Sequence, residues 1–121
     1  MSKILVLEDD ADMRELLREA LEAAGHEVAD AADGDAGLKL FKRSPADLVI
    51  ADIFMPEKDG LDVIRELNAD FPEVKIIAIS GGGRLGAETY LLAASRMGAD
   101  RVMGKPFEMH EIVDAVREVL G

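Results

Sequence analysis

Five polar residues of the sequence each come at or directly after a short apolar run. Glu8 and Asp9 follow the run KILVL, and Asp52 follows DLVIA. Ser80 follows VKIIAI, and Lys105 follows DRVMG and precedes a proline. Carboxylates that lie close together raise one another's pKa unless a cation lies between them. These residues are therefore candidates for one acidic site, provided that the fold brings the ends of the runs together.

A cluster of this composition suits magnesium and phosphoryl chemistry. Oxygen ligands without His or Cys match Mg²⁺, which typically takes one or two carboxylates and keeps several waters. A lysine and a hydroxyl at the rim would add a positive charge and a hydrogen-bond donor for phosphoryl oxygens. A carboxylate in such a site can itself act as the nucleophile and form an aspartyl phosphate.

The apolar runs indicate the strands of a parallel sheet. They occupy residues 3–7, 27–31, 47–51, 74–79 and 100–104. Three of them are nearly continuous in Val, Ile and Leu, which is typical of strands covered on both faces. Segments with helical spacing lie between the runs. The first predicted helix has an apolar stripe and ends at Gly25; the stripe consists of Met13, Leu16, Leu17, Ala20, Leu21 and Ala24. The charged residues between these positions are predicted to face water; they are Arg14, Glu15, Arg18, Glu19 and Glu22.

Five strands alternating with five helices predict an α/β fold, with a doubly wound parallel sheet and helices on both of its faces. We expect a single domain over residues 1–121. In such a sheet the functional crevice lies outside the carboxyl ends of the strands. The five polar residues would all lie at that edge.

Composition and charge narrow the range of partners. The chain of 121 residues has 25 acidic and 14 basic residues, a net charge of −11, and no cysteine. A negative field repels nucleic acid, so we expect no direct nucleic-acid binding. No run approaches the roughly 20 apolar residues of a membrane span, and we expect no membrane insertion. A cytoplasmic protein is the expectation.

Four stretches resemble the motifs of response-regulator receiver domains, and they occur in the family's order. They are ILVLEDDADMRELL, DLVIADIFMPEKDG, IIAIS and GKPF. The resemblance is to chemotaxis-regulator-like members of two-component signalling, and it covers essentially the whole chain. It implies a flavodoxin-like (βα)5 sandwich with the strand order 2-1-3-4-5.

The resemblance also implies roles for the acidic residues. Asp52 matches the phosphoacceptor, and Glu8 and Asp9 match the family's acidic pair. Asp9 would be a direct Mg²⁺ ligand, with Glu8 nearby and acting through water. The backbone carbonyl of Phe54, two residues after the acceptor, would complete the metal site.

Two further residues match family positions at the rim. Ser80 resembles the switch hydroxyl, and Lys105 resembles the lysine that contacts the phosphoryl group. The peptide bond between Lys105 and Pro106 is expected to be cis. The position three residues before the lysine often carries an aromatic side chain in the family, but here it is Val102, which puts the usual coupling between hydroxyl and aromatic in doubt.

The implied function is a signalling switch rather than an enzyme. A histidine kinase or histidine phosphotransfer protein would donate a phosphoryl group to Asp52 in the presence of Mg²⁺, and affinity for an unknown protein target would change. The chain's only chemistry would be its own phosphorylation and dephosphorylation. One alternative is a phosphohydrolase with Asp52 as nucleophile, but haloacid-dehalogenase-like enzymes need an aspartate where Phe54 stands. Another is a passive docking module, which would be expected to lose the acidic pair or the lysine.

A glycine-rich stretch after the fourth run raises a different possibility. Gly81, Gly83 and Gly86 match the spacing G-x-G-x-x-G of dinucleotide-binding loops. That fingerprint belongs in the first strand-to-helix turn, with an acid at the end of the next strand; here the candidate acid, Asp100, stands at a strand's start. We therefore interpret the stretch as a loop, over residues 80–88, that tightens when phosphoryl binds.

Several other polar residues have simpler interpretations. Asp10 and Asp12 are predicted to cap the first helix or complement its dipole. His26 and His110 are predicted to be surface residues. Arg101 is predicted to be exposed and available to a partner.

Overall fold

The computed structural model describes residues 2–53, 60–80, 92, 95–96 and 98–121. Strands and helices alternate along the described chain. They are β1 (Lys3–Leu7), α1 (Ala11–Ala23), β2 (Glu27–Ala31), α2 (Gly34–Arg43), β3 (Leu48–Asp52), α3 (Gly60–Asp70), β4 (Lys75–Ser80), β5 (Arg101–Gly104) and α5 (Met109–Leu120). The remaining predicted helix, between β4 and β5, falls mostly on residues outside the described ranges, as does most of the 80–88 loop.

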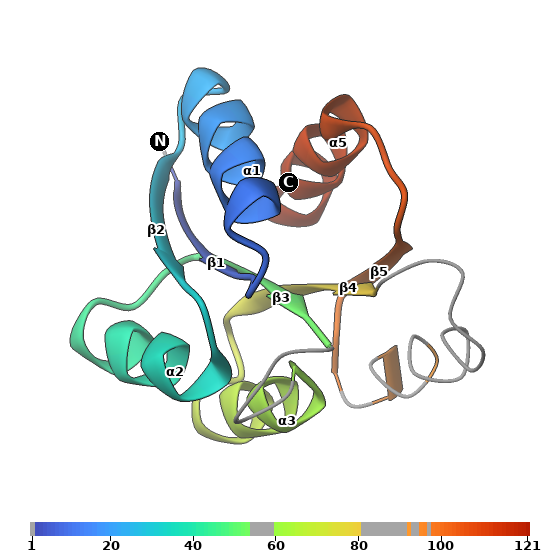
Figure 1. Cartoon of the computed structure of the whole chain (residues 1–121). Coiled ribbons are helices and arrows are strands. Elements are labelled where there is room, and N and C mark those ends of the chain that lie inside the picture. Colours follow the sequence, from blue (N-terminus) through green and yellow to red (C-terminus); the bar gives the residue numbers. More distant parts are fainter. Residues whose placement is uncertain (1, 54–59, 81–91, 93–94, 97) are drawn as a thin grey trace.

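The five strands form one parallel sheet in the order β2-β1-β3-β4-β5, as predicted. Helices α1 and α5 cover one face of this sheet, and α2 and α3 cover the other (Figure 1). The chain passes from β1 outward to β2 and then back across β1 to β3. This reversal of direction places the switch point of the sheet between β1 and β3, which is where ligands bind in open α/β sheets.

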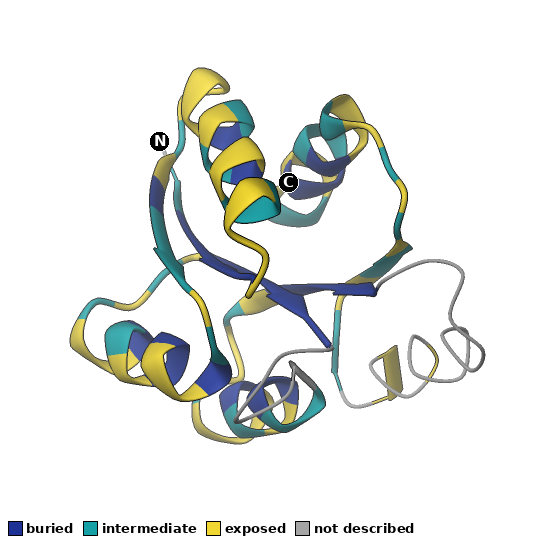
Figure 2. Ribbon diagram, viewed as in Figure 1, coloured by how far each residue is buried: buried dark blue, intermediate teal, exposed yellow. Residues whose placement is uncertain are grey.

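Each central strand contributes to two cores, which explains why its sequence is apolar without alternation. Ile4 and Val6 of β1 pack with α1 and α5, whereas Leu5 and Leu7 pack with α2 and α3. All four side chains are at most 2% exposed. Figure 2 shows that the central strands are buried, whereas the helices expose their outer sides to solvent.

The predicted apolar stripe of α1 is wrong at two positions. Leu17 and Leu21 are fully buried, but Leu16 is 49% exposed, and Ala24 lies beyond the last helical turn and is also exposed. The stripe was too wide because a helix on a sheet buries only the narrow arc that contacts its neighbours. The helix does end as predicted, since Gly25 follows it with φ +97°.

Several capping and surface predictions can be compared directly with the structure. Asp10 caps α1, accepting hydrogen bonds from the amides of Asp12 and Met13 at 3.0 and 3.2 Å. His110 is exposed as predicted.

His26 is only half-buried rather than a plain surface residue, and its Nδ1 is buried with no hydrogen-bond partner among the described residues. The prediction for His26 was wrong because this residue lines a pocket with Val113 and Leu120 of α5, a contact between elements that the local sequence does not show.

Asp100, the acid considered for dinucleotide binding, has a structural role. Its Oδ2 accepts a hydrogen bond from the amide of Ile76 at 2.8 Å, and its own amide donates to the carbonyl of Ile76 at 2.7 Å. These two bonds align the starts of β4 and β5. No helix in the described part of the chain has the length and apolar composition of a membrane span.

Replacing Gly98 by alanine should destabilise the fold more than the same change at Gly25. Gly98 has φ +119°, and a Cβ there would lie 2.6 Å from Cγ of Asn68. Gly25 has φ +97° but open space around it. Gly25→Ala should therefore cost only the backbone strain of about 1 kcal/mol, and Gly98→Ala the strain and a steric clash. Chemical denaturation measures both, and equal losses would contradict the clash.

Candidate functional site

The sheet brings the predicted polar residues to one edge. Glu8 and Asp9 follow β1 directly, Asp52 and Ser80 are the last residues of β3 and β4, and Lys105 follows β5. These four strands are parallel neighbours, so their carboxyl ends meet at the same edge. The position at the strand ends therefore follows from topology, as the sequence predicted.

Three carboxylates form a compact cluster at this edge. Ligand oxygens of Glu8, Asp9 and Asp52 all lie within 4.8 Å of one another. Glu8 is fully buried and Asp52 is 4% exposed, whereas Asp9 is exposed to solvent. This set of oxygen donors fits a hard divalent cation, which could enter from the side of Asp9.

Lys105 bridges the two buried carboxylates. Its Nζ lies 2.7 Å from Oε1 of Glu8 and 3.1 Å from Oδ2 of Asp52. Burial alone would lower the pKa of Lys105, but the hydrogen bonds to Glu8 and Asp52 raise it. The ammonium therefore stays charged. The peptide bond between Lys105 and Pro106 is cis, as predicted, and the amide of Lys105 donates to the carbonyl of Ser80 at 2.7 Å.

Burial raises the pKa of Glu8 from 4.5 to about 7. The hydrogen bond from Lys105 lowers this pKa. The hydrogen bond between Glu8 and Asp52 and the negative charge of Asp52 both raise it further. A buried carboxyl group beside a second carboxylate holds its proton because desolvation and repulsion both disfavour the charged form. Without another cation in the cluster, one lysine does not fully compensate two buried acids.

This shift predicts a dependence of stability on pH in metal-free buffer. Between pH 4.5 and about 7 the folded protein keeps a proton on Glu8 that the unfolded chain has lost. The free energy of unfolding should therefore fall as pH rises through this window, by up to about 3 kcal/mol from this group. Chemical denaturation at several pH values, with Glu8→Gln for comparison, isolates the contribution. A difference between the two proteins that stays constant with pH would contradict it.

Ser80 offers a buried hydroxyl at the same edge. It is fully buried, and its Oγ has no hydrogen-bond partner within the described residues. Ile79, the residue just before Ser80, is paired in register with Asp52, so Ser80 lies one position beyond Asp52 along the sheet. A buried polar group without a partner costs free energy, so this hydroxyl is suited to an oxygen-rich ligand. Phe54 and Gly81, which flank these positions in the sequence, lie outside the described residues.

Arg14 contacts the site, although sequence reasoning placed it on the water-facing side of α1. Its Nη1 donates to the backbone carbonyl oxygen of Glu8 at 2.9 Å. The contact was missed because helical periodicity gives the direction of the Cβ atom, whereas a long side chain can fold back over the preceding turn. The only signal in the sequence was an arginine five residues after Asp9.

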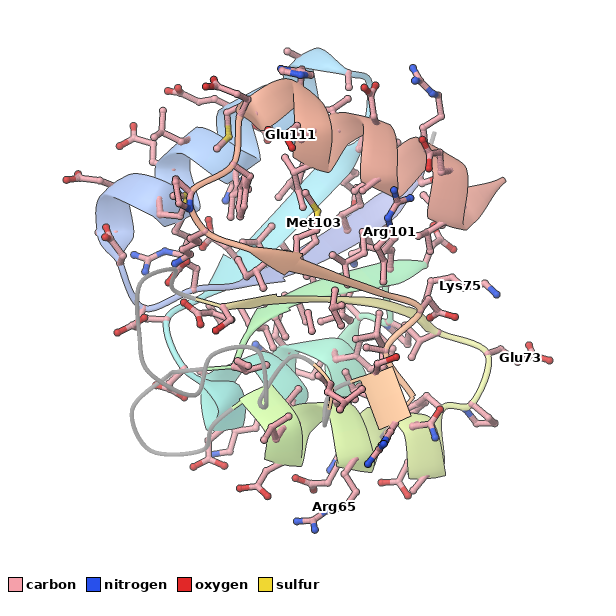
Figure 3. The ribbon with its side chains drawn as sticks, turned by 90° about the vertical axis from the view of Figure 1, so that its right-hand side faces the viewer. Arg65, Glu73, Lys75, Arg101, Met103 and Glu111 are labelled. Carbon is pink, nitrogen blue, oxygen red and sulfur yellow. The ribbon has the colours of Figure 1, made fainter. Side chains whose placement is uncertain are left out.

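At β5 the sequence departs from the aromatic pattern of the family. Val102 is half-buried and packs against the core beneath α2 and α3. Arg101 is exposed, as predicted, but its Nη1 is bound to Oε2 of Glu118 in α5 at 2.5 Å. Figure 3 shows Arg101 extending toward α5, with Met103 between the strand and that helix.

Comparisons with known proteins agree with the motifs and the geometry. The sequence model of the response regulator receiver domain matches residues 4–117. The transcriptional regulatory protein RprY of Bacteroides fragilis is 36% identical over 121 residues, which cover 98% of this chain and 49% of that protein. The chain thus spans about half the length of such relatives. The chemotaxis protein CheY of Thermotoga maritima is 34% identical, with 97% of this chain and 96% of that protein covered.

Solved structures support the same assignment. The crystal structure of the receiver domain of NtrX from Brucella abortus matches with a TM-score of 0.89 and 33% identity, over 97% of both chains. The family's motifs, the strand order and the acidic edge therefore coincide in one molecule. The chain belongs to the response regulator receiver domain family of two-component systems.

Proposed function

We propose that this chain is a phosphoacceptor switch. Asp52 would accept a phosphoryl group from a histidine kinase or a histidine phosphotransfer protein, with Mg²⁺ bound at the acidic cluster. The observation that carries the proposal is the arrangement of Glu8, Asp9 and Asp52 within 4.8 Å, with Lys105 bound to two of them. The family's relatives in signalling and transcription support a regulatory role.

The acidic cluster fits the cation that the family implies. Glu8, Asp9 and Asp52 would hold Mg²⁺, and the carbonyl of Phe54 stays a prediction. Burial, together with the neighbouring Asp52, raises the pKa of Glu8, and a bound cation would favour the charged form of this carboxyl group. Bound Mg²⁺ would neutralise the phosphoryl oxygens and the acids together.

The transfer itself needs one nucleophile and two stabilising groups from this chain. A carboxylate oxygen of Asp52 would attack phosphorus, and the bond between phosphorus and the donor's imidazole nitrogen would break, with its electron pair leaving on the imidazole. The ammonium of Lys105 would move from the carboxylates to a phosphoryl oxygen. The hydroxyl of Ser80, now without a partner among the described residues, would donate to another.

The change in partner affinity would begin at the hydroxyl of Ser80 and at Lys105, because both would change partners on phosphorylation. The amide of Lys105 is bonded to the carbonyl of Ser80, so β4 and β5 would respond together. Val102 is too small for a large inward rotation, so the change would pass instead through the loop over residues 80–88, the segment over residues 90–97 or an interface with a partner. The protein target stays unidentified.

Hydrolysis of outside substrates is not favoured by these residues. A phosphohydrolase would need an acid at position 54, where the sequence has phenylalanine. A passive docking role does not account for the pairing of Lys105 with two buried carboxylates. We therefore propose no enzymatic activity beyond the protein's own phosphorylation and dephosphorylation.

Intact-mass measurement tests the proposal. The protein is incubated with a small phosphoryl donor, such as a phosphoramidate, with and without Mg²⁺. The expected result is the addition of one phosphoryl group that depends on Mg²⁺, with no multiple turnover of small phosphate esters. Failure to gain mass both from this donor and from phosphorylated histidine phosphotransfer proteins would contradict it.

A further inference from the structure

A chain of charged contacts runs from β2 through α1 to the loop that carries the acidic pair. We propose that Arg14 is a positioning residue, which holds this loop in the geometry that binds the cation. The proposal rests on the proposed function, because it concerns the preparation of the same site.

Arg14 contacts the loop that carries the acidic pair through a backbone carbonyl oxygen. Nη1 of Arg14 donates to the carbonyl oxygen of Glu8 at 2.9 Å. This oxygen belongs to the planar peptide unit that ends in the nitrogen of Asp9. Fixing the oxygen therefore fixes the plane from which Asp9 projects. Asp9 is the exposed member of the acidic cluster, and it lacks the burial that holds Glu8 and Asp52 in place.

Arg14 is itself held near the loop by Asp30 of β2. Its Nε lies 3.9 Å from Oδ1 of Asp30 in β2, and the other oxygen of Asp30 is bound by Nη1 of Arg18 at 2.9 Å. The side chains of Arg14 and Asp30 are 24% and 27% exposed. A guanidinium group is a planar fork with several donors, so Arg14 can contact Asp30 with one nitrogen and the loop with another.

The rest of the loop is held by bonds that do not involve the Arg14 side chain. The amide of Glu8 donates to the carbonyl of Ala31 at 3.1 Å, and the amide of Asp10 donates to Oε2 of Glu8 at 3.3 Å. Loss of the guanidinium should thus leave β1 paired and α1 capped. The expected consequence is local, at the peptide between Glu8 and Asp9.

An electrostatic role and a positioning role of Arg14 predict opposite effects of its removal on Mg²⁺ affinity. A positive charge near the site repels a divalent cation, so a purely electrostatic role means that Arg14→Ala binds Mg²⁺ more tightly. A positioning role means that the variant binds it more weakly, because the ligand oxygens are no longer held together. Groups that orient metal ligands typically change metal affinity by 10- to 100-fold when they are removed.

Calorimetric titration with Mg²⁺ distinguishes the two. We expect Arg14→Ala to weaken Mg²⁺ binding about tenfold, and Arg14→Lys to recover part of the loss, since an ammonium keeps one donor but not the fork. Arg65→Ala is the matched control. Arg65 carries the same charge, extends into solvent from α3 on the opposite face of the sheet, and is bound only to Asp62 among the contacts described (Figure 3). Unchanged or tighter binding by a folded Arg14→Ala would overturn the proposal.

Amide hydrogen exchange in metal-free buffer provides a second readout. Exchange at the amide of Asp9, which belongs to the peptide that Arg14 contacts, should be faster in Arg14→Ala than in the wild type and Arg65→Ala, while exchange at Glu8 and in β3 and β4 stays the same. Unchanged exchange at Asp9 would overturn the proposal. A wild type that binds no Mg²⁺ but shows this local difference would contradict the proposed function and still support the role of Arg14.

Discussion

Replacing Asp52 by asparagine should reduce Mg²⁺-dependent phosphorylation to background while leaving the fold intact. The amide is nearly the same shape as the carboxylate and can still accept a hydrogen bond from Lys105, which lies 3.1 Å from Oδ2. It lacks the anionic oxygen that attacks phosphorus. Intact-mass analysis after incubation with a phosphoryl donor measures the loss, and thermal unfolding confirms that the variant is folded.

Asp62→Asn is the matched control for this change. Asp62 is an acid in the first turn of α3, and it is bound to Arg65 on the surface at 2.7 Å. The control should be phosphorylated like the wild type. Full phosphorylation of Asp52→Asn would show that another residue is the acceptor, and would contradict the assignment of Asp52.

Replacing Lys105 by alanine should have two opposite effects at one site. Phosphorylation should slow by about 100-fold, because a charged donor to the phosphoryl oxygens is lost. Mg²⁺ should bind about tenfold more tightly, because the ammonium no longer lies against the carboxylates that would hold the cation. In metal-free buffer the variant should be about 3 kcal/mol less stable, since Glu8 and Asp52 would stay buried without their partner.

Lys75→Ala tests whether these effects arise from the site rather than from net charge. Lys75 is exposed at the start of β4, at the opposite end of the sheet, and points into solvent (Figure 3). It should change neither phosphorylation nor Mg²⁺ affinity measurably. Weaker Mg²⁺ binding in Lys105→Ala would contradict competition between the ammonium and the cation.

The site's location could be predicted from the sequence because it depends on topology. Asp52, Ser80 and Lys105 each end or follow an apolar run, and parallel strands must bring such positions to one edge. The strand order came from resemblance to the receiver family. The cap at Asp10 was also predictable, because capping is a local interaction between residues close in sequence.

The contacts of long side chains could not be predicted in the same way. Arg14 was expected to face water, but its side chain is only 24% exposed and lies near Asp30 of β2. The side chain of Arg18 is 42% exposed, as expected for a residue that faces water, yet it also binds Asp30. The exposure of Leu16 and the burial of the His26 Nδ1 likewise depend on how α1 sits on its neighbours. Helical periodicity describes one element, whereas these features are set by the packing between elements.

The assignment of Asp52 as phosphoacceptor is tested most directly by locating the phosphoryl group. The phosphorylated protein is treated with borohydride, which reduces an acyl phosphate to a primary alcohol and so converts a phosphorylated aspartate to homoserine. Digestion and mass spectrometry then identify the converted residue. Conversion is expected at Asp52 only, in samples phosphorylated in the presence of Mg²⁺. Conversion at Asp9 or Asp10, or a phosphoryl group retained on a residue that borohydride does not reduce, would contradict it.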